Sequence, residues 1–167
     1  MGVVSISTRA ILALLALLLT FPCAYAVAND PLPTRYVSLR SDKVYLRVGP
    51  GDQYPIAWVY HRPGLPLEVI AEFDVWRRVR DWQGEEGWIH SKMLSTQRTV
   101  IIVDGVQPLR QKPDGASPAV ARADSGVIAR LLRCPEGSSW CRIEVNGLRG
   151  WTARPQIWGV HPNEVYD

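Results

Sequence analysis

The chain has 167 residues, with 19 lysines and arginines, 16 aspartates and glutamates, and three histidines. Basic and acidic residues are nearly equal in number, which argues against the clustered basic surface of nucleic-acid-binding domains. We therefore expect no nucleic acid among the partners. Seven tryptophans, thirteen glycines and thirteen prolines, without a long helical pattern, favour short strands joined by turns.

The first 26 residues have the features of a secretory signal. Arg9 precedes an apolar run over residues 10–19, and the small-x-small triplet Ala24-Tyr25-Ala26 follows Pro22. The apolar run is about half of the roughly 20 residues that a helix needs to span a bilayer. We expect cleavage after Ala26, export to the periplasm or the medium, and no stable membrane insertion afterwards. An uncleaved anchor and lipidation at Cys23 are the less favoured alternatives.

Residues 27–37, which include Pro31 and Pro33, are expected to link the signal to the folded part. The chain after this linker is one unit repeated, because four separated landmarks recur at nearly the same offset. The landmarks are Leu46-Arg47 with Leu109-Arg110, Tyr54-Pro55-Ile56 with Ser117-Pro118-Ala119, and 84–89 with 147–152, each 63 residues apart, and 76–79 with 140–143, 64 apart.

Each unit contains five short strand-like segments bounded by glycine, proline and asparagine turns. The expected strands are 43–48, 55–60, 66–71, 76–81 and 86–90 in the first unit, and 106–110, 119–122, 127–133, 140–145 and 150–153 in the second. Five strands in about 60 residues predict an all-β fold, a small barrel or a pair of orthogonal sheets. Segment 91–94 is expected to leave the first barrel as a 3₁₀ turn.

Several of these segments together resemble a bacterial SH3-like (SH3b) domain over residues 38–95. They are 44–51 (Val-Tyr-Leu-Arg-Val-Gly-Pro-Gly), Tyr54-Pro55-Ile56, 76–79 (Trp-Arg-Arg-Val) and 84–89 (Gly-Glu-Glu-Gly-Trp-Ile). The second unit, over 96–160, resembles a diverged copy of the same SH3-like module and lacks the Gly-Pro-Gly turn. The chain also resembles exported proteobacterial proteins built of tandem SH3-like modules. This resemblance implies two tandem five-stranded SH3-like barrels, a tail over 161–167, and binding to cell-wall peptides, to which such modules often tether enzymes.

Six residues of the repeated motifs are expected to be mainly structural. A glycine in a strand suits a place where another strand comes too close for a Cβ atom. A tryptophan ring supplies much of the core of a 60-residue module, because so small a module buries a lower fraction of its surface than a larger domain does. The residues concerned are Gly87, Gly150, Trp76, Trp88, Trp140 and Trp151.

Two cysteines, Cys134 and Cys141, remain after signal cleavage. They flank a six-residue loop on adjacent expected strands, and an exported protein meets an oxidising compartment. The sequence therefore predicts a disulfide that would stabilise the second barrel by roughly 2–3 kcal/mol. Free thiols and a metal site are the alternatives.

No motif in the chain indicates catalysis. A cysteine nucleophile needs a free thiolate beside a histidine, and the predicted disulfide removes both thiols. The Cys-x₂-Cys and His-x₃-His spacings of metal sites do not occur. Glu85-Glu86 is more simply a pair of solvated turn charges than a glycosidase pair. We expect no catalytic residue, no metal and no cofactor.

Five aromatic residues of the first unit are the candidates for ligand binding, because SH3-type barrels take peptides in shallow aromatic grooves. Tyr45 and Tyr54 bracket the turn 49–51, Trp58 and Tyr60 share one strand face, and Trp82 lies at a hairpin tip. Convergence of Tyr45, Tyr54, Trp58 and Trp82 on one open groove would define the site. Trp158 is expected to pack against the tail or between the two units.

The sequence predicts a non-catalytic binding or adaptor protein of the periplasm or cell envelope. Its expected partner is a peptidoglycan stem peptide, and an extended segment of an envelope protein is the second choice. A structural factor that joins envelope proteins is the alternative function, and an enzyme of unrecognised type is the remote one.

Overall fold

The computed structural model describes Gly2 and residues 34–167. The predicted signal, apart from Gly2, and most of the predicted linker lie outside the described residues. Within residues 34–167, no helix is long and apolar enough to cross a membrane.

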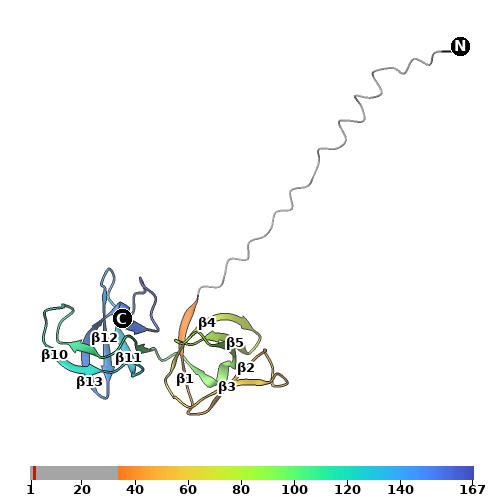
Figure 1. Ribbon diagram of the computed structural model, residues 1–167, viewed down its shortest axis with the longest axis horizontal. Coiled ribbons are helices and arrows are strands. Elements are labelled where there is room, and N and C mark those ends of the chain that lie inside the picture. Colours follow the sequence, from red (N-terminus) through yellow and green to blue (C-terminus); the bar gives the residue numbers. More distant parts are fainter. Residues whose placement is uncertain (1, 3–33) are drawn as a thin grey trace. The chain divides into compact units, whose positions relative to one another are not determined.

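The first half of the described chain forms one antiparallel sheet (Figure 1). Its elements are β1 Arg35–Leu39, β2 Val44–Arg47, β3 Ile56–Tyr60, β4 Pro66–Phe73, β5 Trp76–Arg80, β6 Glu86–His90, the 3₁₀ turn η1 Ser91–Met93, and β7 Leu94–Ser95. The strand order is β3-β2-β6-β5-β4-β1-β7, so β3 and β7 are the two edges. The five predicted strands and the 3₁₀ turn are present, and β6 has the predicted bounds.

The first sheet has seven strands rather than five, because β1 and β7 add a pair that the sequence pattern did not reveal. Residues 35–37, assigned above to the linker, form the first part of β1. Val37 and Leu39 are buried there because β1 lies between β4 and β7 and joins the core of the first barrel.

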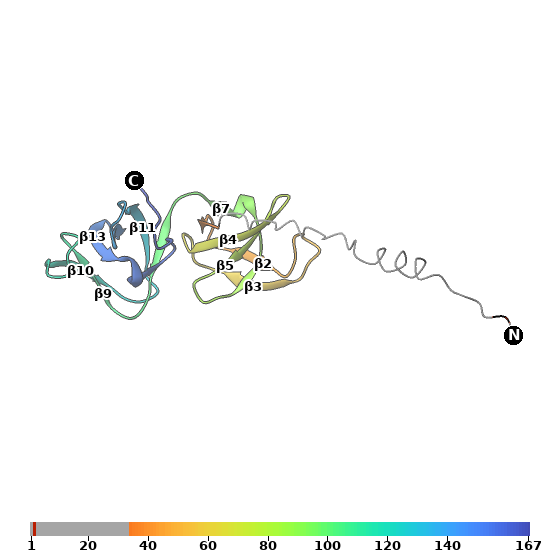
Figure 2. The same cartoon turned by 90° about the horizontal axis from the view of Figure 1, so that it is seen from above.

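The second half repeats this arrangement (Figure 2). Its elements are β8 Thr99–Ile102, β9 Gln107–Arg110, β10 Ala119–Ala123, β11 Ile128–Arg133, β12 Trp140–Val145, β13 Leu148–Ala153, the 3₁₀ turn η2 Arg154–Gln156, and β14 Ile157–Trp158. The order β10-β9-β13-β12-β11-β8-β14 matches that of the first sheet strand for strand. The all-β tandem fold is therefore confirmed, again with two more strands than predicted.

Glycine allows two strands to cross closely in each barrel. A Cβ atom on Gly87 of β6 would lie 2.6 Å from the Leu46 side chain and 2.8 Å from the Arg47 carbonyl oxygen of β2. A Cβ atom on Gly150 of β13 would lie 2.7 Å from Leu109 of β9. In both barrels, the neighbouring strand therefore leaves no room for a side chain at the glycine of the Gly-Trp motif.

The four motif tryptophans differ in burial. Trp76 is buried, and its ring meets that of His90 edge-on, with 5.3 Å between the centroids. Trp88, Trp140 and Trp151 are half-buried.

The predicted disulfide is confirmed: Cys134 and Cys141 are bonded, with their Cα atoms 4.4 Å apart. The bond joins the residue that directly follows β11 to β12, and both cysteines are fully buried. Cys134 also pairs with Tyr166, since each backbone N–H donates to the other's carbonyl oxygen. The C-terminal residues therefore lie against the disulfide-closed loop.

Candidate functional site

The structure does not bring the five candidate aromatics to one groove. Tyr45 of β2 pairs with Val59 of β3, whereas Leu46 pairs with Trp58. Paired residues project to the same face of a sheet, and neighbours along a strand project to opposite faces. Tyr45 and Trp58 therefore face opposite sides of the β2–β3 hairpin and line two different cavities.

The Tyr45 cavity has a volume of about 340 Å³. It is formed by β2, the turn that follows β2, the beginning of β5, the end of β6 and η1. Its lining residues are Lys43, Tyr45, Arg47, Asp52, Trp76, His90, Lys92 and Met93.

Local structure explains how these side chains meet. The residues at 43, 45 and 47 alternate with the buried Val44 and Leu46, so they share the outer face of β2. The η1 turn directly follows β6, and the Nδ1 atom of His90 accepts a hydrogen bond of 3.2 Å from the Lys92 backbone. This bond fixes the His90 ring beside Trp76. The cavity thus has an aromatic wall held in place by the barrel.

Positive charge dominates the Tyr45 cavity. Arg47 lies 3.3 Å from the carboxylate of Asp52 and also donates to the Tyr54 carbonyl oxygen at 2.8 Å. Lys43 and Lys92 have no ion pair within the described part of the chain, and the Lys43 ammonium lies 5.5 Å from the centre of the Tyr45 ring. Three cations facing one carboxylate favour a ligand with negative charge.

The Trp58 cavity is smaller, about 220 Å³, and includes Tyr60 and Trp82. Trp58 is 56% exposed, whereas Tyr60 is 5% exposed and donates from its hydroxyl to Asp81 at 3.0 Å. Burial, together with the charge of Asp81, raises the pKa of Tyr60 well above its usual range. Asp81 also accepts hydrogen bonds from the Gln83 and Glu85 backbone. The inner half of this cavity is therefore a rigid structural cluster, and Trp58 and Trp82 are the aromatic side chains of its accessible half.

Tyr54 lines neither of these cavities. Its ring lies over the turn, where a Cβ atom on Gly49 would be 2.4 Å from it. The structure thus gives Tyr54 a packing contact in the turn.

Within residues 34–167, no three histidine, cysteine, aspartate or glutamate side chains are grouped so that they could hold a metal ion. The thiols of Cys134 and Cys141 are consumed by their bond. The absence of catalysis stays a prediction from the sequence.

A family model for the bacterial SH3 domain matches the chain twice, over residues 40–96 and 103–159. The chain belongs to the bacterial SH3 domain family. Each match covers one sheet apart from its first strand, β1 or β8, so each sheet is one SH3 domain.

Comparison with curated proteins finds no match. Among solved structures, the chain is similar to NlpC2 from Trichomonas vaginalis, with 13% identity and a TM-score of 0.35 over 75% of this chain and 48% of that one. NlpC1 from the same organism gives 13% identity and a TM-score of 0.34 over 74% and 45%. The chain spans less than half the length of either protein.

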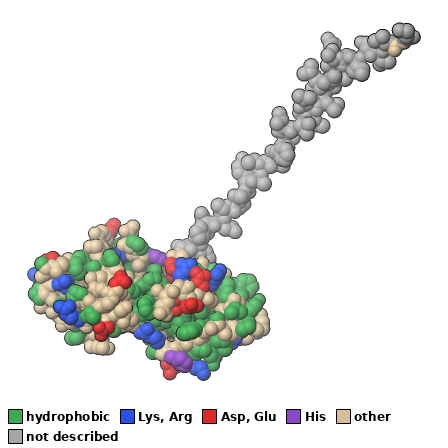
Figure 3. Space-filling model, viewed as in Figure 1, with side chains coloured by type: hydrophobic (Ala, Val, Ile, Leu, Met, Phe, Trp, Pro, Cys, Tyr) green, Lys and Arg blue, Asp and Glu red, His purple; other side chains and the backbone are tan. Residues whose placement is uncertain are grey.

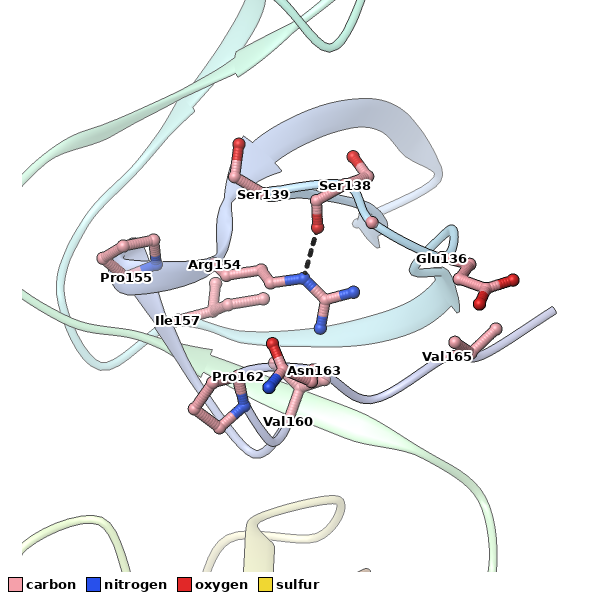
Figure 4. A pocket seen from close by; sticks show the side chains of 11 residues that line it. Glu136, Ser138, Ser139, Arg154, Pro155, Ile157, Val160, Pro162, Asn163 and Val165 are labelled. Carbon is pink, nitrogen blue, oxygen red and sulfur yellow. Dashed lines mark hydrogen bonds between the residues drawn. The ribbon is translucent and has the colours of Figure 1, made fainter.

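The second SH3 domain contains a larger cavity that the sequence did not predict, of about 810 Å³ (Figure 4). It lies between the disulfide-closed loop, η2 and the C-terminal residues 160–165. The sequence predicted the loop only as a disulfide hairpin and the end of the chain only as a tail. No motif indicated that the two would lie together. The cysteine spacing was the available signal, because it marked a loop held in one shape.

Proposed function

We propose that this chain is a non-catalytic binding protein of the bacterial envelope. Its first SH3 domain takes an extended peptide with a free carboxylate, in the first place a cell-wall stem peptide. The observation that carries this proposal is the Tyr45 cavity, which combines an aromatic wall with lysines that have no ion pair among residues 34–167.

The chemistry of the cavity suits such a ligand. The rings of Tyr45 and Trp76 offer apolar area to the peptide chain, as in other SH3-type grooves. Lys43 and Lys92 attract a carboxylate at the mouth, where solvent keeps the attraction moderate and dependent on salt. Hydrophobic side chains also cover much of the visible face of the first domain (Figure 3). The site therefore favours modest affinity for an anionic peptide.

Two features support an envelope location. The predicted signal directs export, and disulfides form and persist in oxidising compartments. The bond between Cys134 and Cys141 is fully buried and closes a short loop. This arrangement suits a protein that folds after export.

Retention of the chain 27–167 on purified murein tests the proposal. We expect Tyr45→Ala and the double variant Lys43→Glu/Lys92→Glu to reduce retention several-fold, the latter most strongly at low salt. Tyr54→Ala is the matched aromatic control, because Tyr54 is equally exposed but outside the cavity.

Arg142→Glu is the single-site charge control, on an exposed residue of β12 without an ion pair among residues 34–167. The proposal is wrong if the wild-type chain is retained no better than an unrelated periplasmic protein, or if the control variants lose as much as the cavity variants.

One observation favours a second function, the joining of envelope proteins. The edge strand β3 has no charged residue, and Ile56 and Trp58 on it are exposed. An uncharged sheet edge can accept a strand from a partner. Crosslinking in cells from position 57, followed by identification of the captured product, separates the two functions, since a protein partner gives a defined adduct and murein does not.

A further inference from the structure

The cavity of the second SH3 domain is held open by three separate constraints. The disulfide closes the loop on one side, and the paired backbone of Cys134 and Tyr166 holds the end of the chain on the other. Between them lies Arg154 of η2. A cavity with fixed walls binds a ligand at a lower entropic cost than one that must form on binding.

Arg154 bridges the two sides (Figure 4). Its guanidinium donates to the carbonyl oxygens of Ser138 at 2.7 Å, His161 at 3.0 Å and Glu164 at 2.8 Å, with a longer contact to Pro135 at 3.4 Å. Four carbonyl dipoles therefore surround this cation and reduce its field in the cavity. Arg154 fixes the walls, and few of its donors are left for a ligand.

One part of the wall is aliphatic, whereas Ser138, Ser139 and Asn163 line the rest beside Arg154 and Glu136. Ile157 is buried at the base, and Val160, Val165, Pro155 and Pro162 surround it. No aromatic side chain lines this cavity, in contrast to the two cavities of the first domain. The aliphatic part suits a flexible hydrocarbon chain.

Glu136 is the acidic side chain among the residues that line this cavity. It is exposed at one end of the cavity and forms no ion pair among the described residues (Figure 4). A carboxylate beside an aliphatic slot complements an ammonium group carried on a hydrocarbon stem.

We propose that this cavity binds the aliphatic ammonium side chain of a lysine-type residue within an extended peptide. The stem lies along Val160 and Val165, and the ammonium meets Glu136. This inference rests on the proposed function and deepens it. The first domain takes the carboxylate of the peptide, and the second domain takes a cationic side chain of the same peptide.

The test uses two capped tripeptides on the ¹⁵N-labelled chain 27–167. One has lysine between two alanines, and the other has norleucine, which keeps the stem but lacks the ammonium. Both are acetylated and amidated, so neither has a carboxylate for the Tyr45 cavity. We expect the lysine peptide to shift the amide signals of Gly137, Ser139 and Asn163 and to bind about two- to fivefold more tightly than the norleucine peptide.

Glu136→Gln should reduce the affinity for the lysine peptide to that for the norleucine peptide. Glu85→Gln, the same change at an exposed position of the first domain, should leave the affinity unchanged. Equal binding of the two peptides, or shifts outside this cavity, would overturn the inference while leaving retention on murein through Tyr45 intact. If the wild-type chain is not retained on murein but the lysine peptide still shifts these signals, the proposed function alone is refuted.

Discussion

Asp81 carries a structural task that its position at a hairpin tip conceals. Its side chain is nearly inaccessible, and it receives hydrogen bonds from the Tyr60 hydroxyl and from two backbone N–H groups of the turn. No ion pair neutralises this carboxylate within the described residues. The three hydrogen bonds therefore replace the water that it loses on burial.

Replacement of Tyr60 by phenylalanine should destabilise the first domain. The variant removes one donor and leaves an oxygen of buried Asp81 without a partner, which costs about 1–3 kcal/mol. The free energy of unfolding in urea measures this loss. Tyr45→Phe is the control, because no hydrogen bond of the Tyr45 hydroxyl occurs within residues 34–167, and it should be neutral. Equal stability of the two variants would show that the Tyr60–Asp81 bond contributes nothing.

The residues of the site could be predicted in part. Strand alternation alone placed Trp58 and Tyr60 on one face, and the structure has both in one cavity. The separation of Tyr45 from Trp58 depends on the register between β2 and β3, where a bulge follows Leu46. A shift of one residue in the pairing moves every side chain of a strand to the opposite face of the sheet. The sequence of either strand alone does not determine this pairing.

At the scale of elements, each barrel has a close approach between the strand that precedes the proline turn and the strand of the Gly-Trp motif. Arg47 of β2 pairs with Trp88 of β6, and Arg110 of β9 pairs with Trp151 of β13. Only one residue pair joins each couple of strands, so they cross rather than run alongside. The crossing brings backbone against backbone and allows no side chain at Gly87.

Gly87→Ala should therefore destabilise the first domain by roughly 1–3 kcal/mol, as overpacking usually does. Its Cβ atom would be 2.8 Å from a backbone oxygen, which cannot turn aside as a side chain can. Thermal unfolding followed by circular dichroism measures the effect. Gly115→Ala is the control, because nothing lies within 4 Å of its Cβ position. An unchanged melting temperature for Gly87→Ala would mean that β2 and β6 can separate at no cost.

Elements with a strong periodic pattern could be predicted, and short ones could not. The bounds of β6 and β12 agree with the sequence prediction because turns and a Trp or Gly-Trp motif mark them. The strands β7 and β14 have two residues each, too few to show alternation. The cavity of the second domain was missed for a related reason, since it joins a loop to chain ends that have no pattern of their own.

At the scale of the whole folded part, residues of the second half contact residues of the first half directly. Ile101 of β8 belongs to the hydrophobic core of the first barrel, and the Thr99 hydroxyl donates to the Gly64 carbonyl oxygen at 2.7 Å. Tyr36 of β1 meets Trp158 of β14 edge-on, with 5.2 Å between ring centroids. Burial, with the charges of Glu68 and Glu164, raises the pKa of Tyr36 to about 12.

An ion pair between Arg98 and Glu164 holds the C-terminal segment close to these residues. Both side chains are largely buried, and Glu164 also accepts a hydrogen bond from the His161 backbone at 3.0 Å. Burial alone would raise the pKa of Glu164, but the hydrogen bond from Arg98 and that from His161 outweigh it and lower the pKa below the ordinary value. The guanidinium of Arg98 also lies over the rings of Tyr36 and Tyr166.

Acid should weaken the fold through this pair. A carboxyl group whose pKa is lower in the folded state stabilises that state above its unfolded pKa, about 4.3 for glutamate, and loses this contribution as the pH falls through the folded pKa. Glu164→Gln should therefore cost about 1 kcal/mol or more at pH 7, and the difference from wild type should shrink as the pH falls below about 4. Urea unfolding from pH 7 to pH 3 measures it. Glu86→Gln, at an exposed pair with Arg80, should give a smaller difference at pH 7. A difference between wild type and Glu164→Gln that stays constant over this range would show that the charge of Glu164 does not hold the end of the chain.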